Sequence, residues 1–127
     1  MTSKKVALEA SKIIQDKKGQ EIVLLNIQKI SVICDYFLIC SGESPIHMQT
    51  IAKELEEKLG QKGINLLNTD DYLNDRWILL DFGDVVVHIF SPEAREYYQL
   101  ERLWADAERE KIDESIGEEK KVISKGA

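Results

Sequence analysis

Two apolar runs joined by Gly83-Asp84 set the strongest constraint on how this chain folds. Residues 78–82 read ILLDF and residues 85–90 read VVVHIF. A two-residue Gly-Asp connection between such runs is typical of a tight β-hairpin turn. The turn also predicts the register. Phe82 faces Val85, and the next inward-facing pairs are Leu80 with Val87 and Ile78 with Ile89.

This register divides the hairpin into two different faces, because successive side chains of a strand point to opposite sides. The face described above is wholly apolar and is expected to be buried. The opposite face combines large aromatic groups with an acid and an imidazole: Trp77, Leu79, Asp81, Val86, His88 and Phe90. Such a mixture is more typical of a recognition surface than of a core, so we expect this face to be exposed.

Helical and extended patterns alternate along the rest of the chain. Helices are predicted over residues 3–18, from Ser44-Pro45 to about Gly60, and from Ser91-Pro92 onward, where a serine cap precedes a proline in the first turn. Strands are predicted over residues 21–28, 36–41 and 64–68. The order α-β-β-α-β-β-β-α predicts a single α/β domain with a mixed sheet. The second helix carries an apolar stripe: Met48, Ile51, Ala52, Leu55 and Leu59.

Composition places the chain among globular proteins, with 43% hydrophobic and 31% charged residues. We expect a folded domain over residues 1–106 and a charged, partly ordered helical tail over residues 107–127. No signal peptide or membrane span is predicted, so a cytoplasmic location is expected. Cys34 and Cys40 are expected to be reduced, and their spacing does not indicate a zinc site. The net charge of −6 argues against nucleic-acid binding and fits a basic protein partner better, but taken alone it favours an acidic surface that serves solubility.

The segment DFGDVVVHIF followed by REYYQLERLW resembles the ribosomal silencing factor family (RsfS, Iojap-like), and so does DYFLICSGES with the helix after it. The resemblance covers roughly residues 3–106. It implies a nucleotidyltransferase-like fold. It also implies a translational repressor that binds a large-subunit ribosomal protein at the intersubunit face and sterically blocks joining of the subunits. One departure is Asp70-Asp71, where members usually carry Glu-Gly, and the tail after Asp106 is placed beyond the family core.

The predicted docking patch combines the second hairpin face with the third helix. Its members are Trp77, Leu79, Asp81, His88, Tyr98, Glu101 and Trp104. Aromatic and charged residues of this kind are enriched at binding hot spots. On the third helix, Arg95 and Arg102 are expected beside Tyr98 and Glu101, at three- and four-residue steps. The alternative is that Tyr97, Leu100 and Trp104 simply pack this helix on the sheet, which is favoured for Leu100 and Leu103.

Two other classes of function stay open from the residues alone. Asp81 and His88 are within hydrogen-bond reach on one face, and Asp81, Asp84 and the Ser41-Gly42 turn suit a nucleotide-binding or nucleotidyltransferase-type enzyme. No partner nucleophile, cofactor motif or metal cage accompanies them, so we predict neither catalysis nor a cofactor. A dimerisation module is the third reading, because an exposed apolar face also suits a homodimer. His47, at the start of the second helix, is expected to face solvent.

Overall fold

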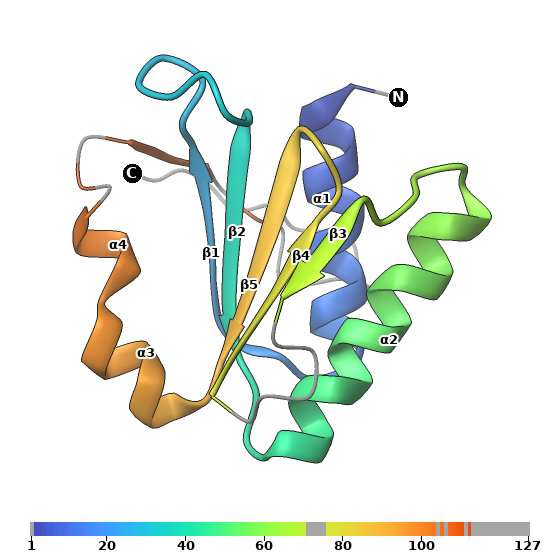
Figure 1. Cartoon of the computed structure of the whole chain (residues 1–127), viewed down its shortest axis with the longest axis vertical. Helices are drawn as coiled ribbons and strands as arrows, with labels where there is room; N and C mark the ends of the chain where they lie inside the picture. The colour runs from blue at the N-terminus through green and yellow to red at the C-terminus, as the bar shows by residue number, and fades with distance from the viewer. Residues whose placement is uncertain (1, 71–75, 104, 106, 111, 113–127) are drawn as a thin grey trace.

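A six-stranded mixed sheet lies at the centre of the molecule, with the strand order β3-β4-β5-β2-β1-β6 (Figure 1). The computed structural model describes residues 2–70, 76–103, 105, 107–110 and 112. The elements are α1 (Ser3–Asp16), β1 (Gln20–Asn26), β2 (Tyr36–Ser41), α2 (Pro45–Gln61), β3 (Asn68–Asp70), β4 (Trp77–Asp81), β5 (Val85–Phe90), α3 (Pro92–Tyr98), α4 (Leu100–Leu103) and β6 (Glu108–Glu110). The predicted order of the first eight elements is confirmed.

The β4–β5 hairpin has the predicted register. Ile78 pairs with Ile89 and Leu80 with Val87, and the amide of Phe82 donates to the carbonyl of Val85 at 2.9 Å. Gly83 begins the turn with a φ of 97°, a conformation that glycine adopts without the strain of a Cβ atom. On its other side β5 pairs in parallel with β2, while the remaining pairs in the sheet are antiparallel.

Helices cover the sheet on both faces (Figure 1). α1 and α2 pack on the first face, where they bury the apolar side of the hairpin together with the predicted stripe of α2: Met48, Ile51, Ala52, Leu55 and Leu59. α3 and α4 cover part of the second face, where Ala94 and Leu100 contact a smaller core that includes Phe90. β2 is therefore enclosed from both sides, as its continuous apolar run predicts.

The serine caps form as predicted, but His47 does not face solvent. The Ser44 hydroxyl accepts from the His47 amide at 3.1 Å, and the Ser91 hydroxyl accepts from Ala94 at 3.1 Å. The imidazole of His47 is part-buried. Its Nδ1 accepts from the Glu43 amide at 2.8 Å, and its Nε2 lies 2.7 Å from the Lys17 carbonyl oxygen. His47 thus ties the start of α2 to the end of α1.

The third predicted helix is broken. Gln99 adopts a left-handed conformation with a φ of 48°, which ends α3 and separates it from α4. The helical spacing of Tyr97 and Leu100 is therefore lost, and the two residues face different surroundings: Tyr97 is 75% exposed, whereas Leu100 is 8% exposed. The sequence gives no warning of this break, since Gln99 is neither glycine nor asparagine.

The tail and the third strand also differ from expectation. Glu108–Glu110 is not helical but forms the edge strand β6, antiparallel to β1. The third strand is shorter than predicted and comprises Asn68–Asp70 instead of residues 64–68. Residues 113–127 lie outside the described part of the chain, as does Asp71. Within the described residues, no helix has the length and apolar character needed to cross a lipid bilayer.

Arg95 is buried and not part of a surface, contrary to expectation, with 8% of its surface exposed. Its Nη1 donates to the Ser41 hydroxyl at 2.9 Å, and its Nη2 donates to the Glu21 carbonyl oxygen at 2.6 Å. These bonds connect α3 to the end of β2 and the start of β1, where β1 has a bulge. A short helix such as α3 gains much of its stability from tertiary contacts of this kind.

Replacing Arg95 by Met tests that connection. We expect the free energy of unfolding to fall by about 2 kcal/mol or more, because the buried Ser41 hydroxyl and Glu21 carbonyl lose charged donors. Urea denaturation of the full chain measures the change. Arg102→Met is the matched control, since Arg102 is exposed and its Nη1 donates to Gln99 on the surface. Equal stabilities of the two variants would contradict the role assigned to Arg95.

Candidate functional site

The second face of the hairpin brings most of the predicted docking residues together. β4 carries Trp77, Leu79 and Asp81, and each lies beside a residue of β5: Phe90, His88 and Val86, respectively. The period of two therefore places these residues on one face, as predicted from the turn. Tyr98, from α3, joins this face because its ring centroid lies 4.8 Å from that of Trp77.

This face is not uniformly exposed, which corrects the sequence-based expectation. The three β5 residues are buried: Phe90 is 0%, His88 4% and Val86 8% exposed. The β4 residues, Trp77, Leu79 and Asp81, remain half-buried. The β5 side is covered because Ala94 of α3 and Leu100 join Val86 and Phe90 in one buried cluster. The rings of Phe37 and Trp77 lie against His88. The accessible part of this face is therefore its β4 side, and His88 offers almost no surface for contact.

His88 instead supports Trp77 from behind. The indole Nε1 of Trp77 donates to Nδ1 of His88 at 3.1 Å, so the neutral imidazole carries its proton on Nε2. The ring of His88 also meets Phe37 edge-on, with centroids 4.7 Å apart. Nε2 is buried and has no hydrogen-bond partner among the described residues. Burial lowers the pKa of His88 to about 4, so the imidazole stays neutral near pH 7.

Asp81 does not pair with His88, contrary to the acid–base alternative. Its Oδ1 accepts from the Gly83 amide at 2.8 Å and so stabilises the hairpin turn. The Nδ1 atom of His88 is already occupied by Trp77. The two groups lie diagonally across the hairpin, as predicted, but each has a different partner. Their arrangement is that of structural polar groups and not of a proton-transfer pair.

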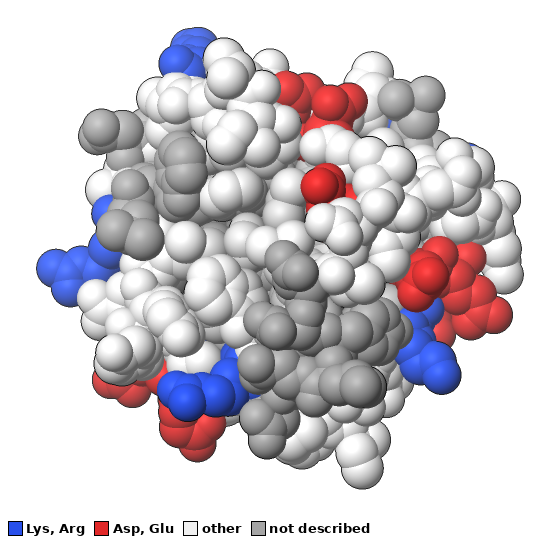
Figure 2. All heavy atoms as spheres, viewed as in Figure 1, with Lys and Arg blue, Asp and Glu red and all other residues white. Residues whose placement is uncertain are grey.

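An aromatic cluster forms the exposed centre of the site. The Trp77 ring packs between Phe90, with centroids 4.9 Å apart, and Tyr98. Tyr97 meets Tyr98 edge-on at 5.0 Å. Tyr98 is 40% exposed and Tyr97 is more exposed still. We call Trp77, Leu79, Tyr97 and Tyr98 the aromatic patch. Figure 2 shows mostly uncharged atoms over β4 and β5, with carboxylates toward the tip of the hairpin.

Tyr97 is a candidate that the sequence did not place on the patch, because an unbroken helix would turn it toward the packing side. Its position follows from the end of α3 at Gln99. Two residues of the predicted docking patch lie outside the described part of the structure: the side chain of Glu101 and all of Trp104. Leu100 packs into the core on the second face, as expected.

The residues proposed for nucleotide chemistry do not converge. Ser41 lies at the end of β2 beside Phe90, whereas Asp84 precedes Val85 at the opposite end of β5. A six-residue strand spans about 17 Å, so Ser41 and Asp84 cannot hold one small group. Gly42 has a packing role, since a Cβ atom there would lie 2.7 Å from Cγ of Met48. Among the described residues, no group of three His, Cys, Asp or Glu side chains is arranged to hold a metal ion.

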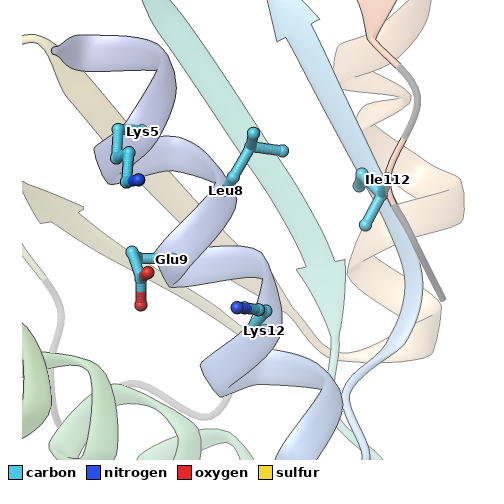
Figure 3. A pocket seen from close by; sticks show the side chains of 5 residues that line it. All are labelled: Lys5, Leu8, Glu9, Lys12 and Ile112. Atoms are coloured by element: carbon cyan, nitrogen blue, oxygen red, sulfur yellow. The ribbon is translucent and has the colours of Figure 1, made fainter. Parts of the chain in front are cut away.

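One hollow in the described surface lies where the parallel strands β2 and β5 lead into α2 and α3, the usual ligand position in open α/β sheets. Its lining combines Arg76 with Glu43 and Glu93, so it has no excess of positive charge for a phosphate. A groove of about 230 Å³ lies on α1 (Figure 3). There Leu8 and Ile112 both pack against the main core, beside Lys5, Glu9 and Lys12. Ile112, which follows β6, therefore lies against α1 in this groove.

Both cysteines are free and buried. Burial raises the pKa of Cys40 to about 12. Burial, followed by the nearby carboxylate of Asp81, raises the pKa of Cys34 to about 11. Neither thiol is therefore activated as a nucleophile near neutral pH, since the thiolate is the reactive form.

The lowered pKa of His88 gives a pH-dependent stability that can be measured. The unfolded state binds a proton near pH 6.5, whereas the folded state binds it only near pH 4, so this contribution to stability is present above pH 6.5 and is lost as the pH falls toward 4. The expected loss is about 3 kcal/mol in the free energy of unfolding. Denaturation of the wild type and of His88→Asn at several pH values measures it. Parallel pH profiles for the two proteins would contradict the assignment.

Comparison with known proteins agrees with the resemblance found from the sequence. The family model described as "ribosomal silencing factor during starvation" matches residues 1–126 and so includes the charged tail that the sequence placed beyond the family core. The chain is 43% identical over 107 residues to the ribosomal silencing factor RsfS of Halalkalibacterium halodurans, covering 84% of this chain and 92% of that protein. It is 39% identical over 113 residues to RsfS of Bacillus subtilis, covering 89% and 96%.

Solved structures support the same conclusion. A crystal structure of a protein from Chromobacterium violaceum has a TM-score of 0.80 at 28% identity, covering 83% of this chain and 88% of that one. A crystal structure from Bacillus halodurans has a TM-score of 0.68 at 43% identity, covering 79% and 90%. With a family match over nearly the whole length and relatives above 30% identity, this chain belongs to the ribosomal silencing factor family.

Proposed function

We propose that this protein represses translation by docking its aromatic patch on a large-subunit ribosomal protein at the intersubunit face, where its bulk blocks joining of the small subunit. The single observation that supports this most is the half-buried indole of Trp77, held from behind by His88 and from the side by Tyr98. Fixing an aromatic side chain before binding reduces the entropy lost on association. Tryptophan and tyrosine are also the residues most often found at binding hot spots.

The charge of the protein suits a basic partner. The chain carries a net charge of −6, and Asp81 lies beside the patch on β4 while Asp84 is exposed at the hairpin tip. Opposite charges accelerate encounter and fix the orientation of the complex. An acidic surface would be unfavourable for direct contact with the phosphate backbone of RNA, since binding to it depends on lysine and arginine. The proposal therefore assigns the primary contact to a protein of the large subunit.

A steric mechanism needs no reaction at the site, which agrees with the geometry. Asp81 stabilises a turn, His88 is neutral and buried, and Ser41 binds Arg95. These groups have structural partners and do not converge on a common point. The nucleotidyltransferase-type alternative thus has no observation in its favour among the described residues. Residence in the cytoplasm, where ribosomal subunits join, is part of the same proposal.

Subunit joining tests the proposal directly. Purified large subunits are incubated with the full chain, small subunits are then added, and the mixture is separated by sedimentation. We expect the chain to sediment with large subunits and to reduce the fraction of joined ribosomes. Trp77→Ala and Tyr98→Ala should each weaken binding by more than about 1 kcal/mol, because each removes one ring of the Trp77–Tyr98 contact.

Ile46→Ala is the control for these variants, since Ile46 is 76% exposed on α2, which packs on the opposite face of the sheet from the patch. Circular dichroism establishes that each variant is folded before binding is measured. If folded Trp77→Ala and Tyr98→Ala bind as the wild type does, the aromatic patch is not the docking surface. If the chain stays bound to fully joined ribosomes, the steric mechanism is wrong.

A further inference from the structure

Three large aliphatic side chains project from the loop between β1 and β2. Val32 is 103%, Ile33 81% and Ile30 44% exposed. We call these three residues the aliphatic tip. Scattered exposed aliphatic residues are ordinary, but three within four positions on one short loop form a contiguous apolar surface. In Figure 1 this loop and the turn of the β4–β5 hairpin lie at the same end of the sheet.

The loop that carries the tip is ordered by internal contacts. The amide of Ile27 donates to the Asp35 carbonyl at 2.9 Å, and the amide of Ser31 donates to the Ile27 carbonyl at 2.9 Å. The Ser31 hydroxyl accepts from the Ile33 amide at 3.1 Å. Ile27 and Cys34 are buried in the core of the second face and anchor both ends of the loop. The exposed side chains are β-branched and therefore stiff at χ1, so little freedom is lost when they are covered.

Acidic side chains border this tip. Asp35 follows it directly, and its amide donates to the Asp84 carbonyl at 2.9 Å, which brings the hairpin turn against the loop. The Oδ1 atom of Asp81 accepts from the Gly83 amide at 2.8 Å, so Asp81 and Asp84 lie on either side of the hairpin turn that contacts Asp35. Lys29 lies next to Ile30, and its Nζ is 3.9 Å from Oε2 of Glu108, whose charge is opposite. We call Asp35, Asp81 and Asp84 the acidic rim. At this end of the molecule Figure 2 shows red atoms over the hairpin turn and a smaller blue group over the β1–β2 loop.

The acidic rim joins the tip to the aromatic patch. Asp81 is the last residue of β4, on the strand and face that carry Trp77 and Leu79. The surface thus continues from Trp77 along β4 to the hairpin turn and then to the β1–β2 loop. Leu67, which is 69% exposed, adds an apolar residue beside the turn, since its Cδ1 would lie 3.4 Å from a Cβ atom on Gly83.

We propose that the aliphatic tip is a second anchor of the docking surface, inserted into an apolar hollow bordered by lysine or arginine on the same basic protein that binds the aromatic patch. This inference rests on the proposed function and adds a contact at the far end of the sheet. The occupant is assigned by charge: three carboxylates around exposed aliphatic groups complement a basic, partly apolar protein surface and repel RNA.

Two isoleucines of nearly equal exposure allow a matched test. Ile33 lies on the tip, before β2, whereas Ile46 follows the other end of β2 at the start of α2. Binding of the full chain to purified large subunits is measured for the wild type, Ile33→Ser and Ile46→Ser. We expect Ile33→Ser to weaken binding about tenfold and Ile46→Ser to leave it unchanged. Equal binding by all three proteins overturns the proposal.

Charge reversal tests the assigned partner. Asp84→Lys is expected to weaken binding and to reduce its dependence on salt, because an attractive charge contact is lost. Stronger binding of this variant would place RNA or another acidic surface against the tip and overturn the proposal. So would a change in self-association of Ile33→Ser by light scattering with unchanged binding to subunits, since a second copy would then be the occupant.

The outcomes separate this inference from the proposed function. If Trp77→Ala loses binding while Ile33→Ser does not, the aromatic patch stands and the tip does not take part. If both variants lose binding and Ile46→Ser does not, one continuous surface is supported. If the wild type fails to bind large subunits, the proposed function is wrong and the second anchor is rejected with it.

Discussion

The cross-strand pairing of β4 with β5 is the constraint on which the rest of the structure depends. A shift of one residue would place Ile78 and Leu80 on the surface and turn Trp77 toward α1 and α2. The two-residue turn prevents that shift. Gly83 adopts the positive φ that the turn needs, and Oδ1 of Asp81 accepts a hydrogen bond from the Gly83 amide. A few local contacts therefore determine both the main core and which side of the sheet carries the aromatic patch.

The second face becomes a site because its cover is incomplete. The β5 half is buried, with α3 packed on it, so Phe90 and His88 form a firm support, while the β4 half stays accessible. The hydrogen bond from Trp77 to His88 joins the two halves. Burial keeps that imidazole neutral and able to accept, since a protonated Nδ1 could not. His88, which the sequence suggested for proton transfer with Asp81, is thus a support for the half-buried indole of Trp77.

The features predicted correctly depend on residues that are close together in the sequence, and the features missed depend on residues that are far apart. The hairpin register, the buried stripe of α2 and the caps at Ser44 and Ser91 belong to the first group, and all are confirmed. The break at Gln99 and the strand Glu108–Glu110 depend on contacts with distant parts of the chain, such as the exposed edge of β1. The burial of His88 depends on its packing against Phe37 of β2 and Trp77 of β4, which no local pattern indicates. Family membership was predicted correctly, because the hairpin and following helix form a long and specific segment.

The account makes one central claim: the β4 side of the second face is covered when the protein binds the large ribosomal subunit. Oxidative footprinting of the full chain, alone and with an excess of large subunits, measures this at individual side chains. We predict strong protection of Trp77 and Tyr98 on binding and unchanged labelling of Ile46 on α2. Unchanged labelling of Trp77 and Tyr98 in a chain that is demonstrably bound, with protection elsewhere, would contradict the account.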